Sequence, residues 1–495
     1  MTNKIYEIEL LKQDFKLYHS AHQTHINYQL EVPEGATELF ITFHYEPLNE
    51  RSPHALERSL IKEGLNPSLT KESDNYRNLL TLSINDPEGF RGAHHYFNTN
   101  QEIILSEHSA SLGFIAGPIR TGRWEIILSC HGIFSDFVEG QIQVRVKCGE
   151  DYSYSWGIPL SNVGFKQKIR DCSQTTGIGW SFQTIELHTH TNHSDAQHTT
   201  QELLQAAEDL KLDWLAISDH NTTSALYEAK DNDNYNFNGK IIPAIEFTTF
   251  FGHFLLHGPI DYLNINWTQV GLHQIDELLG ELSHFPLSIT IAHPFSPGNP
   301  YCTGCRWDYP LPNLYNVDAI EVWNEPNPHL YESNTKAFNR WVQFLDQGYE
   351  IAATVGHDWH RPLEENQVVA RMYINLPEDA GDLDLIKSLQ YGRSYSTLRP
   401  QFHQLTINDY YGLGDRIKLQ ATNHLDLQIS GLNDDEKILI YSNLGLMTTI
   451  EFDQSQSIQS YRYAFTALDL QYIRLEVRNS HQHLIAFTNC FYFEL

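Results

Sequence analysis

The chain has 495 residues, which is too long for a single hydrophobic core, so we expect two to four domains. It is 41% hydrophobic and 12% aromatic, which excludes a disordered protein. Its 62 acidic and 33 basic residues give a net charge of −29, which argues against nucleic acid as a partner. Because we see no apolar run suited to a secretion signal or membrane span, we expect a cytoplasmic protein without a membrane partner.

The first 180 residues show the two-residue alternation of apolar and polar side chains that is typical of half-buried β-strands. Turn residues such as Gly117, Pro118 and Gly122 separate the runs. Several short strands with turns between them predict a β-sandwich over residues 1–180. The clearest runs are 38–43, 79–84, 124–129 and 141–146.

From about 181 to 400, strand-like runs alternate with amphipathic helices. Thr199 and Glu202 fit a capping box, and the residues after them repeat apolar side chains about every 3.6 residues, which predicts a helix. Strands alternating with helices indicate an α/β domain. Three later helices are predicted at 272–284, 333–347 and 380–391.

After residue 400 the pattern returns to short β runs, which predicts a second, smaller β-sandwich over 401–495. The fold class is therefore α/β, with the strand–helix region at 181–400 flanked by a β-sandwich on each side. The C-terminal runs are 404–407, 437–441, 472–477 and 484–487.

The chain has a lone C-x-x-C pair, Cys302 and Cys305. Because no second pair accompanies it, the sequence does not favour a structural zinc site, and we expect a loop pair in a reducing compartment. The other four cysteines are scattered along the chain: Cys130, Cys148, Cys172 and Cys490.

The strongest functional signal is His188 and His190, followed by Asp195. Two histidines at positions i and i+2 of a strand point to the same face. Imidazoles and carboxylates that converge on one face are ligands that Zn²⁺, Mn²⁺ or Fe prefers. The run therefore predicts a metal site, with Asp195 as the third ligand.

Similar ligands end the later strand-like runs, which predicts a βα barrel with its site on one face. Half of the chain's 26 histidines fall between 188 and 360, which supports a site in this region. Glu246 ends an apolar run, and a carboxylate there could bridge two metal ions. The expected further ligands are His220, Glu246, His253, His293, Asp358 and His360.

Some neighbouring residues allow two interpretations. His253 and His257 share one short run, and we prefer His253 as the ligand and His257 as structural. His193 could be a ligand or an exposed loop residue. Asp219 could orient a ligand or cap a turn, and Glu321 could support a ligand or pair with an arginine.

Arg306, Arg361 and Arg393 are candidates for anchoring an anionic substrate. The guanidinium group offers a bidentate fork for phosphate or carboxylate. Each arginine could equally be a surface or salt-bridging residue.

The ordered motif set resembles the PHP (polymerase and histidinol phosphatase) superfamily over about 182–400. The motifs are His188-x-His190-x4-Asp195, Asp219-His220-Asn221, Glu246, Ala292-His293-Pro294 and Asp358-x-His360. The resemblance implies a distorted (β/α)7 barrel with two or three divalent metal ions (Zn, Mn or Fe), held by the nine ligands named above. One departure is His357, which stands where a serine is common and which would point to the opposite face of the strand.

The whole chain looks closer to the carbaryl-hydrolase-like (CehA/McbA-like) branch, on four less specific motifs. These are Gly122-Arg123-Trp124, Ala319-Ile320-Glu321-Val322-Trp323-Asn324, Gly392-Arg393-Ser394-Tyr395 and Ala486-Phe487-Thr488-Asn489. The superfamily implies a phosphoesterase, whereas the branch implies hydrolysis of a carboxylic ester or carbamate.

We therefore expect a metal-dependent hydrolase, most simply a phosphoesterase, that attacks a small-molecule ester with metal-activated hydroxide. Asp358 or His220 would pass a proton to the leaving group, and Arg393 would clamp an anionic substrate. A carboxylic ester or carbamate hydrolase is the alternative. A non-catalytic, metal-stabilised binding scaffold is a second one, and the sequence leaves homo-oligomer formation open.

Overall fold

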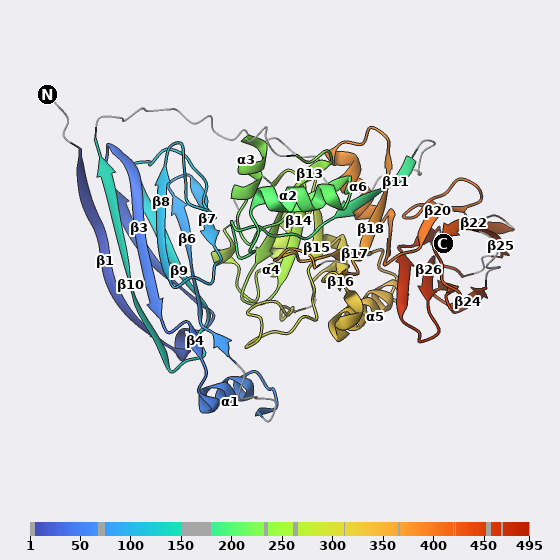
Figure 1. The fold of residues 1–495 in the computed structure, drawn as a ribbon, viewed down its shortest axis with the longest axis horizontal. Helices are drawn as coiled ribbons and strands as arrows, with labels where there is room; N and C mark the ends of the chain where they lie inside the picture. Colours follow the sequence, from blue (N-terminus) through green and yellow to red (C-terminus); the bar gives the residue numbers. More distant parts are fainter. Residues whose placement is uncertain are drawn as a thin grey trace.

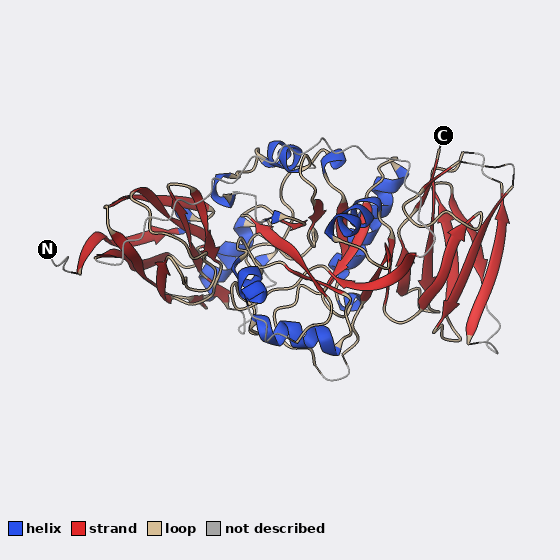
Figure 2. Ribbon diagram, turned by 90° about the horizontal axis from the view of Figure 1, so that it is seen from above, coloured by secondary structure: helices blue, strands red, loops and turns tan. Residues whose placement is uncertain are grey.

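The computed structural model describes residues 5–67, 75–149, 180–231, 236–260, 266–310, 312–364, 367–418, 420, 422–451, 457–466 and 469–494. The molecule is elongated, with the N-terminal strands at one end and the C-terminal strands at the other (Figure 1). Most helices gather in the middle part (Figure 2).

Cys172 lies outside the described residues. No helix in the described ranges is both long and apolar enough to cross a bilayer.

The N-terminal part consists of two four-stranded antiparallel sheets that share one hydrophobic core. Leu39, Ile41 and Phe43 are buried on alternate positions of one strand, as the period of two requires. The first sheet has the order β1 (Tyr6–Tyr18), β10 (Phe137–Cys148), β3 (Ala36–Glu46) and β8 (Asn100–Ser106). The second has the order β2 (Thr24–Val32), β9 (Gly122–Gly132), β6 (Leu79–Asp86) and β7 (Gly89–His94). Smaller elements are η1 (His19–Ala21), α1 (Pro53–Lys62) and the paired strands β4 (Asn49–Glu50) and β5 (Tyr76–Arg77).

Seven strands of the middle part neighbour one another in chain order. They are β11 (Trp180–Glu186), β12 (Trp214–Ile217), β13 (Lys240–Thr248), β14 (His253–His257), β15 (Ser288–Ile291), β16 (Ala319–Asn324) and β17 (Ala352–Gly356). They pair in parallel except for β14, which is antiparallel to both of its neighbours. An isolated bridge between Thr189 and Trp359 joins the segments that follow the first and last of these strands.

Helices lie between these strands. The predicted helices are confirmed, with α4 and α6 a few residues shorter than predicted and α5 shifted by one residue: α2 (Thr200–Asp209), α4 (Ile275–Leu282), α5 (Glu332–Asp346) and α6 (Asp382–Tyr391). The capping box of α2 is present, because Thr199 accepts from the Glu202 N–H and Glu202 accepts from the Thr199 N–H. The sequence did not predict α3 (Ser224–Asp231) or the short turns η4 (Trp267–Gln269), η5 (Leu314–Asn316) and η6 (Pro328–Leu330).

The C-terminal strands extend the sheet of the middle part across position 400. After β11 the sheet continues through β18 (Arg371–Pro377), β19 (Ser394–Thr397), β27 (Leu484–Thr488), β26 (Tyr472–Arg478), β23 (Lys437–Ser442) and β24 (Gly445–Ile450). Two short strands join its side, β21 (Arg416–Ile417) and β28 (Phe491–Phe493). A separate three-stranded sheet consists of β20 (Gln401–Ile407), β22 (Asn423–Ser430) and β25 (Ile458–Phe465). The long sheet therefore contains strands from both sides of position 401, while Gln401 itself begins β20 of the separate sheet.

The N-terminal part packs directly against the middle part. The indole N–H of Trp267, which is 1% exposed, donates to the Ser83 hydroxyl at 3.0 Å. The Gln23 amide donates to the Phe250 carbonyl at 3.1 Å, and the His25 ring stacks on Phe250 with centroids 4.6 Å apart. These contacts hold the two parts together across the seam.

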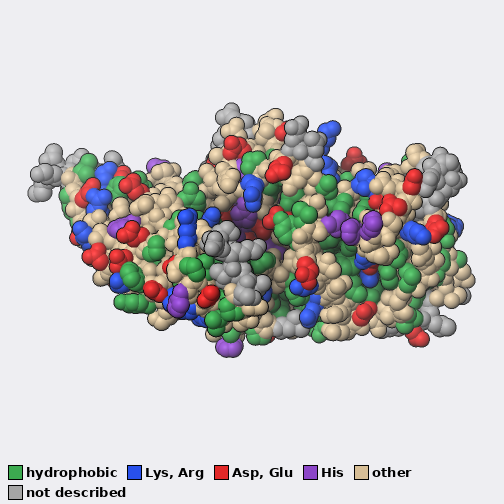
Figure 3. Space-filling model, turned by 60° about the horizontal axis from the view of Figure 1, so that its bottom comes forward, with side chains coloured by type: hydrophobic (Ala, Val, Ile, Leu, Met, Phe, Trp, Pro, Cys, Tyr) green, Lys and Arg blue, Asp and Glu red, His purple; other side chains and the backbone are tan. Residues whose placement is uncertain are grey.

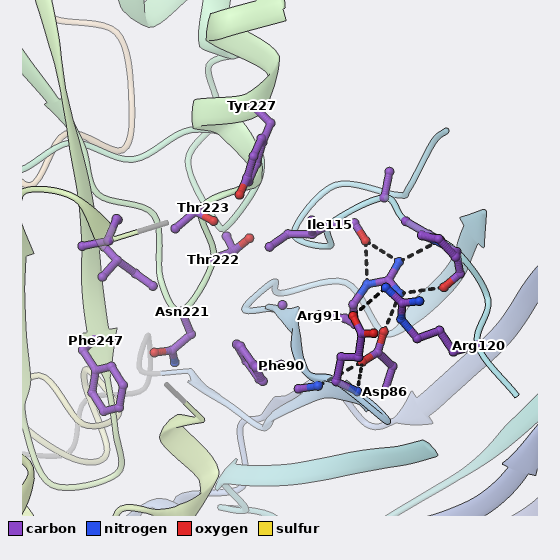
Figure 4. A pocket seen from close by; sticks show the side chains of 18 residues that line it. Asp86, Phe90, Arg91, Ile115, Arg120, Asn221, Thr222, Thr223, Tyr227 and Phe247 are labelled. Atoms are coloured by element: carbon purple, nitrogen blue, oxygen red, sulfur yellow. Dashed lines mark hydrogen bonds and ion pairs between the residues drawn. The ribbon is translucent and has the colours of Figure 1, made fainter. Parts of the chain in front are cut away.

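A second feature of the seam is a pocket of about 310 Å³ (Figure 4). Phe90 and Arg91 lie on its N-terminal side, and Asn221 and Tyr227 on the other. The Arg91 guanidinium ion-pairs with Asp86 at 2.8 Å and also donates to three backbone carbonyls. Arg91 is therefore engaged in holding the wall of this pocket.

Candidate metal centre

The candidate ligands gather at one edge of the strands of the middle part. His188 and His190 follow β11, and His293 follows β15. Carboxyl ends of parallel strands meet at the same edge. His253 joins them because β14 runs antiparallel, so its first residue pairs with Thr248 at the end of β13. Antiparallel pairing thus brings His253 to the same edge as the ligands on the parallel strands.

One group of side chains consists of His188, His190, Glu246 and Asp358, whose ligand atoms all lie within 4.8 Å of one another. Asp358 Oδ1 lies 3.0 Å from His190 Nε2 and 3.3 Å from His188 Nε2. Glu246 Oε2 lies 3.5 Å from His188 Nε2. Three of the four are buried, and the Asp358 side chain is 18% exposed.

A second group shares His190 and adds Asp195, His220 and His360, again within 4.8 Å. Asp195 Oδ1 lies 3.1 Å from His360 Nε2 and 3.4 Å from His220 Nε2. Two adjoining groups of nitrogen and oxygen atoms are suited to hold more than one ion.

Glu246 belongs to the first group and also reaches His220 of the second. Its Oε1 accepts from His253 Nδ1 and from His293 Nε2, each at 3.0 Å. Its Oε2 lies 2.8 Å from His220 Nδ1, and the side chain is fully buried. One carboxylate therefore faces separate imidazoles with each oxygen, which is the position that a bridging ligand requires.

Other buried carboxylates accept hydrogen bonds from the ligands or from the loop that carries them. Glu321 accepts from His188 Nδ1 at 3.1 Å and from the His293 N–H at 2.9 Å. Asp219 accepts from the N–H and hydroxyl of Thr191 and from the Ser194 hydroxyl. Glu321 thus supports two ligands, and Asp219 orders the loop that leads to Asp195.

Two ligand positions have an unusual backbone. His293 has φ 23° and Asp358 has φ 49°, in the left-handed region. Residues other than glycine adopt this region at a cost of about 1–3 kcal/mol each. Each residue is the second after the end of a strand, so the turn there redirects its side chain toward the cluster.

The carboxylates of the cluster are ionised. Burial raises the pKa of Glu246, but His220 and other imidazoles outweigh it and hold the pKa well below its usual value. Burial also raises the pKa of Asp358, which His188 and its neighbours likewise hold well below the usual range. The pKa of Asp195 is lowered by nearby histidines against the effect of burial. Three negative charges therefore converge here, of which Asp195 and Glu246 have side chains that are at most 8% exposed.

The imidazoles respond to these charges. Burial lowers the pKa of His293, but its hydrogen bond with Glu246 raises it to about 9. For His360, Asp195 outweighs burial and raises the pKa to about 10. Protons on the imidazoles and divalent cations would compete for the same atoms.

The residues fit a metal ion, because several buried atoms of the cluster make no well-directed hydrogen bond among the described residues, although imidazole nitrogens lie close to some of them. A buried polar atom without a partner is costly, and a divalent cation would satisfy several of these atoms at once. The atoms are His188 Nε2, Asp195 Oδ1, Glu246 Oε2 and His253 Nε2.

Three of the nearby histidines do not join the cluster. His193 bonds Ser224 and Glu228, and His257 Nε2 bonds the Leu187 carbonyl. His357 bonds Glu186 and the Ala370 carbonyl, on the side away from the cluster. All three are bonded to other groups.

The structure corrects the expected place of Arg393. Its side chain is 2% exposed, lies 3.5 Å from Asp415 and stands over the rings of Trp180 and Tyr391. It therefore packs at the junction with the C-terminal strands and does not line the pocket above the ligands. Arg306 pairs with Asp308, and neither it nor the exposed Arg361 lines that pocket.

The ligands open into a space of about 480 Å³, which we call the metal-centre pocket. Figure 3 shows histidine and acidic side chains in a hollow near the middle of the molecule. Sequence reasoning missed its opposite wall, which includes Arg77, His95 and Phe97 of the N-terminal part. No motif marks these residues, because only the packing of the two parts brings them here.

Cys302 and Cys305, expected as a loop pair, are joined in a disulfide and also line this pocket.

No protein-family model and no curated protein matches the chain. A solved two-domain protein from Bacteroides vulgatus, containing a predicted PHP-like metal-dependent phosphoesterase, is 13% identical with a TM-score of 0.37, covering 63% of this chain and 96% of that one. An amidohydrolase from Chromobacterium violaceum is 14% identical with a TM-score of 0.25, and the match covers 37% of this chain and 89% of that one. A candidate metal-dependent phosphoesterase from Bifidobacterium adolescentis is 17% identical with a TM-score of 0.26, and the match covers 37% of this chain and 91% of that one. All three TM-scores lie below 0.5, so we base the function on the site itself.

Proposed function

We propose that this protein is a metal-dependent hydrolase that cleaves a phosphate ester of a small molecule. The observation that carries the proposal is Glu246, a fully buried carboxylate placed between two groups of imidazoles and carboxylates. A mere structural core gains nothing from such a cluster, because burying charges costs more than packing apolar side chains in their place.

The residues that would hold two or three divalent ions are the nine predicted ligands. His188, His190, Glu246 and Asp358 form one group, and His190, Asp195, His220 and His360 form the next. His253 and His293 complete the set through Glu246. When bound, Zn, Mn or Fe ions would polarise the ester and make water nucleophilic near neutral pH.

The proposed roles of the chain's own residues follow from their contacts. Asp358 has a depressed pKa, so it is ionised near neutral pH and has no proton to donate, which suits a metal ligand better than a general acid. Its Oδ2 lies 3.8 Å from His293 and is less engaged than Oδ1. His220 is held between Glu246 and Asp195, which suits a ligand better than a mobile proton donor.

The fold that positions the site is, we propose, a distorted seven-stranded barrel. The order of β11 to β17 and the bridge between Thr189 and Trp359 support closure of the strands. The antiparallel β14 accounts for the distortion. Two sheets around one core likewise support a β-sandwich for the N-terminal part.

A carboxylic ester or carbamate hydrolase is the second candidate. Phe97, Tyr76 and Tyr301 line the metal-centre pocket, and aromatic walls favour an uncharged aryl ester. The same ligands would serve either reaction, so the choice depends on the substrate that the wall accepts.

The test combines metal analysis with hydrolysis by the full chain. We expect bound metal and hydrolysis of p-nitrophenyl phosphate or bis-p-nitrophenyl phosphate by the Mn²⁺- or Zn²⁺-loaded protein. Glu246→Gln should lose at least one ion and reduce kcat by about 100-fold or more, because a neutral amide cannot replace the central charge. His257→Gln is the matched control, since this buried histidine bonds only the Leu187 carbonyl among the described partners. Hydrolysis of p-nitrophenyl acetate alone would favour the ester reaction, and bound metal without any turnover would favour a scaffold.

A further inference from the structure

The metal-centre pocket has two walls from different parts of the chain. The ligands form one wall, and the other comes from the N-terminal part, including Arg77 on β5 and His95 just after β7. The seam beneath this wall is tightly packed, since Trp267 and Gln23 bond across it. The second wall is therefore a fixed part of the pocket.

His95 shows that this wall faces a ligand-sized space. It is 5% exposed and lines the pocket, and its ring centroid lies 4.7 Å from that of His220. Among the described residues its nitrogens make no hydrogen bond, unlike those of its neighbour His94, which bonds Gln101. A buried imidazole without a partner, beside a candidate ligand, points to a polar group that occupies the pocket.

Arg77 is the only lysine or arginine among the described residues that line the pocket. Its guanidinium lies over the Phe97 ring, 5.0 Å from the centroid. Stacking of this kind orients the planar fork while leaving its N–H groups available at the edge. Within the described ranges, Arg77 forms no ion pair with a carboxylate.

Many arginines of this acidic chain, which has 62 acidic and 33 basic residues, are paired with a carboxylate. Four other arginines that were considered for anchoring a substrate, or that line the other seam pocket, do have a carboxylate partner. The pairs are Arg91 with Asp86, Arg120 with Glu88, Arg306 with Asp308 and Arg393 with Asp415. Arg77 is therefore the available anion-binding group at the metal-centre pocket.

We propose that Arg77 binds the anionic group of the substrate from the N-terminal wall, so that the pocket selects phosphate esters over uncharged esters. The inference rests on the proposed function and assigns the selection of substrate to the N-terminal part. A guanidinium fork matches two phosphate oxygens, which an uncharged ester does not offer. The N-terminal part then belongs to the active site rather than flanking it.

The experiment compares p-nitrophenyl phosphate with p-nitrophenyl acetate, which share a leaving group, on the metal-loaded full chain. Arg77→Gln should lower the ratio of kcat/KM for phosphate to that for acetate by about 10-fold or more, mainly through KM. Arg77→Lys should restore part of the ratio. Arg120→Gln is the matched control, because this arginine lies at the other seam pocket and pairs with Glu88, and it should leave the ratio unchanged.

Binding of inorganic phosphate, measured by calorimetry, separates this inference from the proposed function. We expect wild-type protein to bind phosphate about 10-fold more tightly than Arg77→Gln. An unchanged ratio and unchanged phosphate affinity in Arg77→Gln would overturn the role of Arg77, even if the protein is an active hydrolase. Absence of metal and turnover in the wild type would overturn the proposed function, while the phosphate affinities would still decide the role of Arg77.

Discussion

At the scale of single residues, the cluster depends on charges that compensate one another. Glu246 is a buried carboxylate and Asp358 a half-buried one, and nearby imidazoles keep both ionised. Removing one member leaves the others with unpaired buried charge, which costs several kcal/mol. Residues behind the ligands matter because they set the direction in which each imidazole points.

Glu321 provides the sharpest test of such support. It accepts from His188 Nδ1 and from the His293 N–H without standing at the centre of the cluster. Glu321→Gln should weaken metal affinity by about 10- to 100-fold. The neutral amide would replace the charged acceptor that orients the His188 imidazole.

Metal titration against a competing chelator measures this affinity. The number of ions bound at saturating metal should stay that of the wild type, whereas Glu246→Gln should lose an ion. An affinity equal to that of the wild type would show that Glu321 does not orient His188.

At the scale of elements, the seam contains buried neutral histidines. Burial, with a smaller effect from Lys62, lowers the pKa of His22 to about 3, and burial lowers that of His25 to about 4. Both values lie below the ordinary 6.5, so the folded protein holds these rings neutral where the unfolded chain protonates them. Their contribution to stability is present above pH 6.5 and is lost as the pH falls toward 4 for His25 and toward 3 for His22.

We therefore expect the free energy of unfolding to fall below pH 6.5, by up to about 1.4 kcal/mol per pH unit for each such histidine. Denaturant unfolding of the full chain between pH 7 and pH 5 measures the slope. His22→Gln keeps an acceptor for the Ile133 N–H. It should reduce the change of the unfolding free energy with pH by the contribution of one histidine. The same slope in the variant and the wild type would contradict the prediction.

Local patterns predicted much of the middle part. The capping box at Thr199 and the apolar periodicity located the helices, because such signals lie within one turn of chain. The strand-end histidines were identifiable because the edge of a sheet collects residues that follow its strands. Arg77 and His95 were not, since they reach the pocket only through packing between distant segments. Arg393 was placed wrongly because its motif says nothing of its burial against Asp415.

At the scale of the whole molecule, metal binding at the cluster would be coupled to stability. The cluster joins side chains that follow β11, β12, β15 and β17, so ions bound there would tie much of the middle part together. An ion that binds only the folded state stabilises it by about 2.7 kcal/mol at 100 times its dissociation constant.

Removing metal with a chelator should therefore lower the midpoint of thermal unfolding by several degrees. Differential scanning calorimetry before and after chelation, and after Zn²⁺ or Mn²⁺ is restored, measures the shift. The shift should shrink in Glu246→Gln, which has less metal to lose. An unchanged midpoint in the wild type would show that bound ions do not connect these strands.

The continuity of the sheet beyond position 400 also affects the order of events during synthesis. The Asn489 side chain accepts from the Ala353 N–H at 2.7 Å and donates to the Ala353 carbonyl at 3.0 Å, which fixes β17. Asp358 and His360 follow directly after β17. A ribosome must therefore have delivered the chain as far as residue 489 before these last two ligands are secured, so the metal centre matures late even though its first histidines emerge early.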